Sequence, residues 1–299
     1  MKKLFSIGLF IIISIYSLTA NCEIKTNVGI STKQVDATNT YRIDFDGYLF
    51  WVNVTYGSEL KFDSKINLCG AFWEIVDDER NYSMGVSYFT SYNDRDGNLA
   101  DSDYFYLNGA KSVFCYSDTE LSTDMSEFNL YGDYTFYKKD NISFKALAEY
   151  SYQKFEYTGR NTLQEDYLFG TVTFVSADTI KYEIEHNMYK VGIEGEFIGR
   201  FYGKAKLFYI PYVKSEDRDD HLMMNKRMEG EGDGDGYEAV ITVGYKYNNW
   251  DFALRFSHIE FDVDGSQTQT LFSTGSTAKV NWESETDEDI IELKISYKF

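Results

Sequence analysis

Two short acidic runs, far apart in the chain, carry residue types that could activate a water molecule. In the first, Asp94-Arg95-Asp96, two carboxylates stand two residues apart. In the second, Asp217, Asp219 and His221 follow one another at the same two-residue step. Because side chains two residues apart lie on one face of a β-strand, each run can present its polar groups to one side.

A histidine beside a carboxylate is suited to act as a general base, because the anion favours the imidazolium and fixes its tautomer. Asp219 and His221 form such a pair, and Asp94 and Asp96 opposite them could hold a water and complete a proton relay. A plain alternative is that both runs are solvated acidic loops, since the formal net charge of the chain is −19. The spacing alone leaves both interpretations open.

Calcium binding is a further alternative for the acidic runs. The segment from Asp94 begins like an oxygen-rich loop, but Phe105 stands where an EF-hand needs its bidentate Glu. Glycines alternate with acidic residues over 230–236, a pattern that fits weak calcium binding or, more simply, a flexible loop tip. No metal site is therefore predicted.

The dominant pattern along the chain is an alternation of apolar and polar residues with period two, which is typical of β-strands. It is clearest at the C-terminus, where polar residues separate Ile291, Leu293, Ile295, Tyr297 and Phe299. A strand with one lipid face and one luminal face has this pattern. A terminal aromatic residue on such a strand resembles the assembly signal of bacterial outer-membrane barrels.

Ten such segments occur, and the connections between them alternate between long and short. The long ones cover roughly 35–57, 94–124, 155–188, 214–236 and 264–287. We predict an all-β fold, a ten-stranded antiparallel transmembrane β-barrel with five long extracellular loops and short periplasmic turns. A secreted β-sandwich would explain the alternation but not the rhythm of the connections.

Composition excludes several other classes of protein. Aromatic residues make up 18% of the 299 residues and there is one proline, which argues against disorder and favours long paired strands. After the first 20 residues no apolar run is long enough for a membrane-spanning helix. Nucleic acid is excluded as a partner because the chain would repel phosphate.

The N-terminus indicates an export signal. Lys2 and Lys3 precede the apolar segment 4–18, and Ala20 and Cys22 offer small residues for cleavage. We therefore predict a signal peptide over residues 1–22, cleaved after Ala20 or Cys22, and a single barrel domain over residues 23–299.

Several of these features together resemble the omptin family, the outer-membrane proteases of Gram-negative bacteria. Its members pair an Asp-x-Asp with an Asp-x-His across the mouth of a ten-stranded barrel. Here Asp94-Arg95-Asp96 matches the first motif and Asp219-Asp220-His221 the second. The surrounding 215–221 is similar to the family's Ser-Ser-Asp-Asn-Asp-Glu-His, and 57–60 and 70–73 resemble its Ser-Gln-Leu and Gly-Ala-Ile-Asn-Trp stretches.

The resemblance implies an aspartic-type endopeptidase, a hydrolase that cleaves at basic and often dibasic sites on the outside of the cell. His221, oriented by Asp219, would activate a water that Asp94 and Asp96 also hold. Asp217 matches an acid of the substrate pocket for a basic side chain, and Asp36 is the nearest candidate for a second pocket acid. Cationic peptides or proteins are the expected substrates.

The resemblance also implies contact with outer-membrane lipid. Family members carry basic residues on the outer wall that grip lipopolysaccharide phosphates. Tyr152 matches the tyrosine of that patch, but Lys154 and Glu156 follow where an acidic residue and an arginine would be expected. No Arg lies near Ile184 in the sequence. We predict no cofactor, and the sequence leaves a lipopolysaccharide requirement open. The alternative function is a non-catalytic barrel, an adhesin or narrow channel, whose acidic loops bind cations.

Overall fold

The computed structural model describes residues 24–49, 52–93 and 96–299. The predicted signal peptide, residues 1–22, lies outside the described residues. The described residues form twelve β-strands: β1 (Ile24–Leu49), β2 (Val52–Asp77), β3 (Tyr82–Asn93), β4 (Asp96–Leu107), β5 (Ala110–Lys139), β6 (Ile142–Asp166), β7 (Thr171–Val175), β8 (Ile180–Phe197), β9 (Phe201–His221), β10 (Lys226–Tyr247), β11 (Trp250–Leu271) and β12 (Ser276–Lys298). In this part of the chain we find no helix suited to crossing a membrane.

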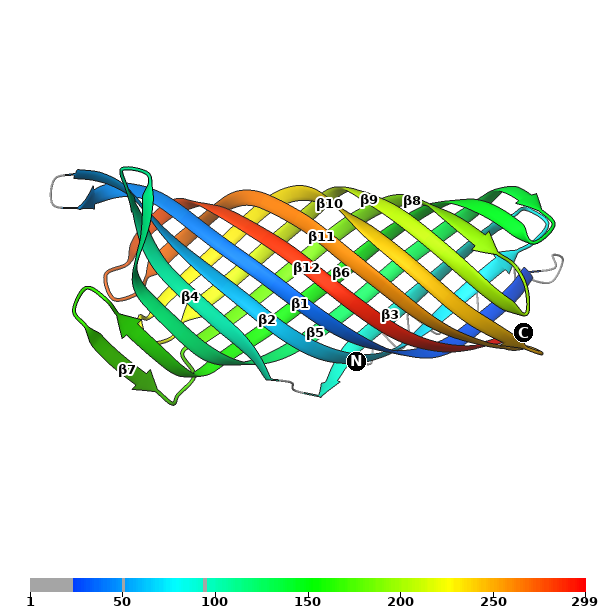
Figure 1. The fold of residues 1–299 in the computed structure, drawn as a ribbon, viewed down its shortest axis with the longest axis horizontal. Helices are drawn as coiled ribbons and strands as arrows, with labels where there is room; N and C mark the ends of the chain where they lie inside the picture. Colours follow the sequence, from blue (N-terminus) through cyan, green and yellow to red (C-terminus); the bar gives the residue numbers. More distant parts are fainter. Residues whose placement is uncertain (1–23, 50–51, 94–95) are drawn as a thin grey trace.

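The strands close into a ring of antiparallel pairs (Figure 1). β3 and β4 occupy one position in the ring, because they follow each other between β2 and β5. β7 pairs only with β6 and stands outside the ring. The other strands pair in chain order, and β12 returns to β1 through the register Val28↔Tyr297. The ring therefore has ten strands, which confirms the predicted antiparallel barrel.

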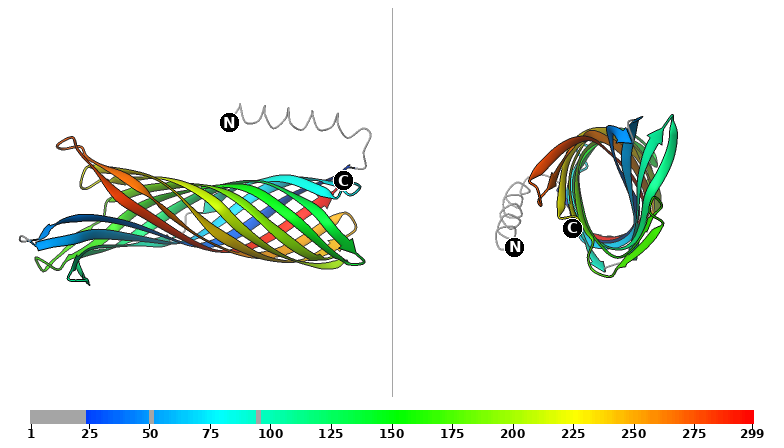
Figure 2. Two further views of the ribbon diagram at one scale, coloured as in Figure 1. Left: turned by 90° about the horizontal axis from the view of Figure 1, so that it is seen from above. Right: turned by 90° about the vertical axis from the view of Figure 1, so that its left-hand side faces the viewer.

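The two ends of the barrel differ in the height of their hairpins (Figure 2). At the end that holds the C-terminus, tight turns such as Asn248-Asn249 join the strands. At the other end, the segments predicted as long connections mostly continue the strands. The β4–β5 hairpin is an example, since Asn108 and Gly109 close it with φ of 53° and 81°, the positive values that a type I′ turn requires.

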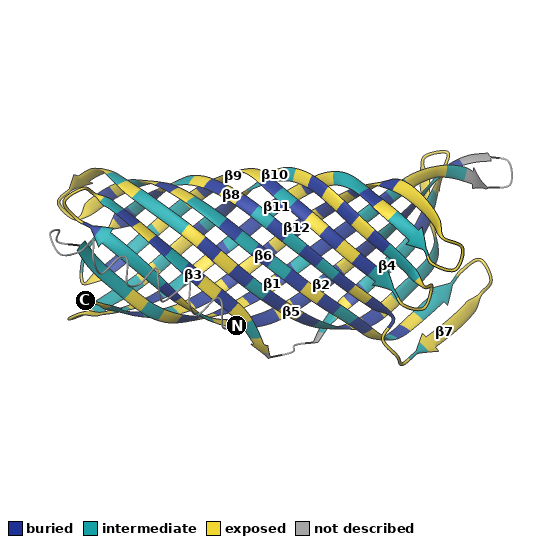
Figure 3. Ribbon diagram, turned by 180° about the vertical axis from the view of Figure 1, so that it is seen from behind, coloured by how far each residue is buried: buried dark blue, intermediate teal, exposed yellow. Residues whose placement is uncertain are grey.

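The outer wall carries an apolar band that faces lipid. Buried and exposed residues alternate along each strand (Figure 3), as expected when successive side chains point to opposite faces. Ile30, Leu207, Ile241 and Leu293 point outward and are 51–66% exposed. Further toward the tall hairpins the outward positions become charged, as at Glu216, Arg218 and Asp220 on β9. The membrane-spanning segment therefore lies between these charged residues and the end with the short turns.

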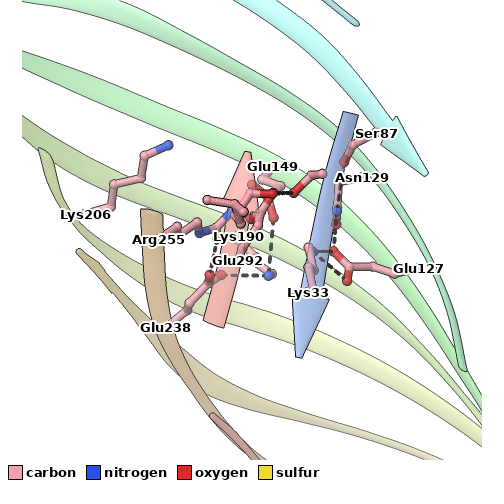
Figure 4. Close-up of polar contacts among 12 residues, drawn as sticks. Lys33, Ser87, Glu127, Asn129, Glu149, Lys190, Lys206, Glu238, Arg255 and Glu292 are labelled. Atoms are coloured by element: carbon pink, nitrogen blue, oxygen red, sulfur yellow. Dashed lines mark hydrogen bonds and ion pairs between the residues drawn. The ribbon is translucent and has the colours of Figure 1, made fainter. Parts of the chain in front are cut away.

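The lumen is filled by side chains in two layers. An aromatic layer lies toward the tall hairpins, where the ring of Phe62 stacks 4.6 Å from that of Tyr182. On the short-turn side of this layer lies a network of ion pairs that includes Lys33–Glu127 at 2.7 Å and Lys190–Glu238 at 2.8 Å (Figure 4). Cavities of about 300 and 170 Å³ lie among polar residues on the short-turn side of the aromatic layer.

Candidate active site

A bulge in β9 determines which residues of this strand face the lumen. Before it, even-numbered residues such as Phe208 and Ile210 are buried; after it, odd-numbered residues such as Ser215 and Asp219 are buried. The register shifts on both sides of Pro211, the one proline of the chain. Proline cannot donate to a ladder and is tolerated at bulges. The bulge therefore aligns Ser215, Asp217, Asp219 and His221 along the luminal face.

Asp219 and His221 form a hydrogen-bonded pair at the end of this row. His221 Nε2 lies 3.0 Å from Asp219 Oδ2, and the Asp219 side chain is fully buried. Burial alone would lower the pKa of His221, but the charge and hydrogen bond of Asp219, helped by Asp101, raise this pKa above its ordinary value. The carboxylate thus orients the imidazole and stabilises its protonated form.

Two carboxylates of β4, Asp101 and Asp103, face this pair. Ser58 Oγ donates a hydrogen bond to Asp101 Oδ1 at 3.2 Å. Burial and the neighbouring Asp103 raise the pKa of Asp101 to about 7, while His221 counteracts the rise. Burial also raises the pKa of Asp103, and His221 again opposes this. The charges of Asp101, Asp103, Asp219 and His221 are therefore coupled in one cluster.

Asp101 and Asp103 were not among the site residues predicted from the sequence, although the signal was available. Asp101-Ser102-Asp103 repeats the Asp-x-Asp spacing of Asp94-Arg95-Asp96 within the same segment. That segment was expected to be a loop, in which a two-residue step does not define a common face. In the structure it belongs to β4, and both carboxylates lie near His221.

The predicted first motif is described only in part. Asp94 lies outside the described residues. The backbone of Asp96 opens β4 as the register partner of Ser122, and its side chain is not described. Asp96 precedes Asp101 by five strand positions, which corresponds to roughly 16 Å along the strand. The described carboxylates that interact with His221 from β4 are thus those of Asp101 and Asp103.

Lys226 adds a positive charge to the cluster. It is the first residue of β10 and the register partner of His221. Burial lowers the pKa of Lys226, while Asp219, Asp103 and Asp101 counteract this. An ammonium here reduces the repulsion among the carboxylates without neutralising them all.

Asp217 lies two residues before Asp219 on the luminal face of β9, beside Gln267 and Tyr41. Gln267 Nε2 donates to Asp217 Oδ2 at 3.4 Å, and Tyr41 donates to Gln267 Oε1 at 2.8 Å. Burial, followed by the charge of Asp219, raises the pKa of Asp217 to about 8. A Cβ at Gly230 would overlap the Asp217 carboxylate, so a larger residue there would displace that carboxylate. The Asp217 carboxylate thus has an amide and a tyrosine among its neighbours, with Asp219 close enough to act on it.

Asp36, the predicted second pocket acid, lies elsewhere. Its side chain is 55% exposed and forms an ion pair of 3.2 Å with Lys65. Asp36 alternates with the luminal residues Val35 and Ala37 and therefore lies on the outer wall. On β1 it is Tyr41 that is linked to Asp217, because both side chains form hydrogen bonds with Gln267.

The run 230–236 is part of β10 rather than a flexible loop tip. Gly230, Gly232 and Gly234 pair with β9 on one side and with β11 on the other. The expectation of a loop tip is thus wrong. The glycines have another reason, because Trp282 and the β11 backbone approach this part of β10 too closely for a Cβ. Among the described side chains, no group of three or more His, Cys, Asp or Glu is arranged to hold a metal ion.

The outer-wall patch implied to bind lipopolysaccharide phosphate contains a lysine surrounded by carboxylates. Lys154 Nζ lies 3.0 Å from Glu183, 3.1 Å from Glu156 and 3.5 Å from Glu185. A phosphate approaching this ammonium would meet three carboxylates. The surroundings of Lys154 therefore disfavour a lipid phosphate at this lysine.

The fold and the site together define a class of protein, a ten-stranded membrane barrel with an Asp/His cluster beyond its lipid-facing band. The family model described as the Omptin family matches residues 62–298 of the chain. The chain therefore belongs to the omptin family, a family of outer-membrane proteases. It is an outer-membrane protein of a Gram-negative bacterium, which confirms the predicted family and location.

Solved structures agree with this fold. The crystal structure of the outer membrane protease OmpT from Escherichia coli superimposes with a TM-score of 0.76 at 16% identity, covering 94% of this chain and 100% of that one. OprG from Pseudomonas aeruginosa reaches a TM-score of 0.40 at 9% identity, covering 92% and 95% of the two chains. The OprG match is too weak to support any argument. No curated protein sequence matches the chain at a significant level.

Proposed function

We propose that this protein is an endopeptidase in which His221, oriented by Asp219, activates a water molecule. The observation that carries the proposal is the 3.0 Å contact between His221 and the buried Asp219, opposite Asp101 and Asp103. Asp101 and Asp103 are proposed as the carboxylates that hold the water from the other side. The assignment of this role to Asp94 and Asp96, predicted from the sequence, is the alternative, and substitution of each aspartate tests the two assignments against each other.

In the proposed reaction the imidazole of His221 accepts a proton from the water as the water oxygen attacks the scissile carbonyl carbon. A C–O bond forms, and the carbonyl electrons move to the carbonyl oxygen. When the carbonyl re-forms, the C–N bond breaks and the leaving nitrogen takes the proton from His221. Asp219 stabilises the transient imidazolium. No acyl-enzyme forms, so no Ser or Cys nucleophile is needed.

The proposed substrates are cationic peptides or proteins cleaved beside a basic residue, in dibasic sequences in particular. Asp217 supplies a buried carboxylate next to the pair, and it would bind the basic side chain. The formal charge of −19 supports the same preference, because a negative groove concentrates cationic substrates and salt weakens this effect. Because the proposed water-activating groups are Asp101, Asp103, Asp219 and His221, we propose that the enzyme is of the aspartic type.

The proposal is tested by incubating the refolded full chain with a fluorogenic library of dibasic peptides. We expect cleavage next to Arg or Lys, with kcat/KM falling as ionic strength rises. Absence of cleavage, or a preference for acidic peptides, would reject it. A non-catalytic narrow channel is less well supported, because the aromatic layer around Phe62 and Tyr182 fills the lumen among the described residues.

A further inference from the structure

The strand β7 offers an unpaired edge at the rim of the barrel. It forms a hairpin with β6 through the registers Asp166↔Thr171 and Thr162↔Val175. Within the described ranges, no strand pairs with its other edge. Figure 1 shows this hairpin standing away from the barrel wall, at the end opposite the C-terminus. An open edge presents backbone N–H and C=O groups that another extended chain can pair with.

The free edge leads toward the proposed catalytic pair. β7 lies on the same side of β6 as β8 does, since β6 pairs with β7 over 162–166 and with β8 over 142–159. Four residues separate Val175 from Ile180, the register partner of His221. The connection is held there, because Thr179 donates its N–H to Gly159 O at 2.8 Å and accepts from Leu222 N at 3.0 Å. A chain paired with β7 would therefore continue toward His221.

One face of the hairpin is exposed and largely apolar, and Glu165 lies on it opposite Val172. Val172 is 67% and Phe174 63% exposed, and Leu163 lies directly opposite Phe174 at 41%. This face is separated from the lipid-facing band by the charged stretch around Lys154, Glu156 and Glu183. Lipid therefore does not cover it. An extended polypeptide fits both features, because its backbone pairs with the edge and alternate side chains contact the apolar face.

We propose that β7 is an exosite, at which an extended segment of a polypeptide substrate adds as a strand and is guided toward His221. The inference rests on the proposed protease function, which it extends to the class of substrate. The favoured substrates are polypeptides with an extended, alternating apolar segment next to the basic cleavage site. Peptides that contain the basic site alone lack this contact.

The experiment compares a short dibasic fluorogenic peptide with two long ones, which carry the same sequence and an extension of roughly ten residues, long enough to cover β7 at about 3.3 Å per residue. The extension alternates Val and Thr and is placed before or after the basic pair in separate peptides. We expect the KM of one long peptide to be about tenfold below that of the short peptide, with similar kcat. An extension methylated on alternate backbone nitrogens, which removes N–H donors but keeps the side chains, should lose this advantage.

The matching protein variant is Val172→Thr with Phe174→Thr, which removes apolar surface and keeps strand propensity. We expect it to raise the KM of the long peptide roughly threefold to tenfold and to leave the short peptide unchanged. Val113→Thr on β5, also an exposed rim valine at 40%, is the control and should change neither peptide. An equal loss on both peptides, or no advantage of either long peptide, would overturn the inference.

Binding separates this inference from the proposed chemistry. The dissociation constant of the long peptides is measured by fluorescence anisotropy with the His221→Ala protein, with and without the two β7 substitutions. Weaker binding after those substitutions supports the exosite even if no cleavage is ever seen. Unchanged binding overturns it. A change from dimer to monomer in the β7 variant would also overturn it, because the edge would then pair with a second copy of the chain.

Discussion

Asp219 and Asp220 are neighbours in sequence and lie on opposite faces of β9. Asp219 is buried in the lumen and contacts His221, whereas Asp220 faces outward and accepts hydrogen bonds from Arg218 at 2.9 Å and Arg227 at 2.6 Å. The same residue type is thus available as a proposed catalytic partner and, one position later, as part of a surface ion pair.

This neighbour relationship gives a matched test of the proposed mechanism. Asp219→Asn should lower kcat by roughly 10²- to 10⁴-fold, the usual contribution of general-base catalysis, because the imidazole loses its orienting carboxylate. Asp220→Asn should change kcat little, since exposed ion pairs contribute little. Peptidase assays on both refolded variants, with the heat-modifiable electrophoretic band as a control for folding, check this. Equal activity of the two variants would contradict the mechanism.

The pocket acid predicts a selectivity that depends on pH. The pKa of Asp217 is raised to about 8, so below pH 8 the empty pocket is mostly neutral and a basic side chain must displace a proton. The ratio of kcat/KM for matched Arg and Ala peptides should therefore rise by up to tenfold per pH unit toward pH 8 and then level off. Titration of His221 affects both peptides and cancels in the ratio.

Asp217→Asn is the variant that checks this assignment. It should lower the ratio and make it independent of pH, while the Ala peptide is cleaved at nearly the wild-type rate. Measurement of both peptides from pH 5 to pH 9 decides the point. A wild-type ratio that falls as the pH rises would exclude Asp217 as the pocket acid.

The outer wall predicts activity without lipopolysaccharide. Lys154 is held by Glu156, Glu183 and Glu185, so an added phosphate group would meet three carboxylates at this lysine. Peptidase activity of protein refolded in neutral detergent should change less than twofold when lipopolysaccharide is added. Substituting the three glutamates by Gln should make the same protein bind lipopolysaccharide more tightly. Strong activation of the wild-type protein would contradict this interpretation of the patch.

The C-terminal residue predicts an assembly defect. Phe299 N donates to Thr26 O at 2.9 Å, next to the β1–β12 seam that closes the barrel. Deletion of Phe299 should leave more protein in the periplasm and less in the folded, heat-modifiable form. Fractionation of cells that express the two forms at equal levels measures this. Wild-type amounts of the truncated protein in the outer membrane would reject the role of Phe299 as an assembly signal.

The alternation of residues was sufficient to predict the ring, because lipid outside and packed side chains inside impose period two on every strand. It also placed Asp217, Asp219 and His221 on a common face, which the structure bears out. The heights of the hairpins could not be obtained in this way. Beyond the lipid band the outward residues are polar and several inward residues, such as Asp101 and Asp103, are acidic, so β4 loses the alternation of apolar and polar residues and resembles a loop.

Two features depended on three-dimensional pairing. The bulge at Pro211 changes which residues of β9 face inward, and one proline does not reveal that shift. The pairing of β1 with β2 and β12 places Asp36 on the outer wall and Tyr41 near the pocket. The match of short motifs in the first hairpin did not specify how β1 pairs with β2 and β12. Without that register, the inward residues of β1 could not be distinguished from the outward ones.

The choice between the two Asp-x-Asp runs is the sharpest test of the site. Asp101 interacts with His221 and Asp103, whereas the backbone of Asp96 lies five positions earlier on β4. Asp101→Asn and Asp103→Asn should each lower kcat by roughly 10²-fold or more, because each removes a proposed water-holding carboxylate. Asp96→Asn and Asp94→Asn should retain most activity. All four substitutions have the same chemistry, so each serves as a control for the others, and the heat-modifiable band reports folding. If activity is lost in Asp94→Asn and Asp96→Asn but kept in the other two, the first run holds the water and the β4 assignment is wrong.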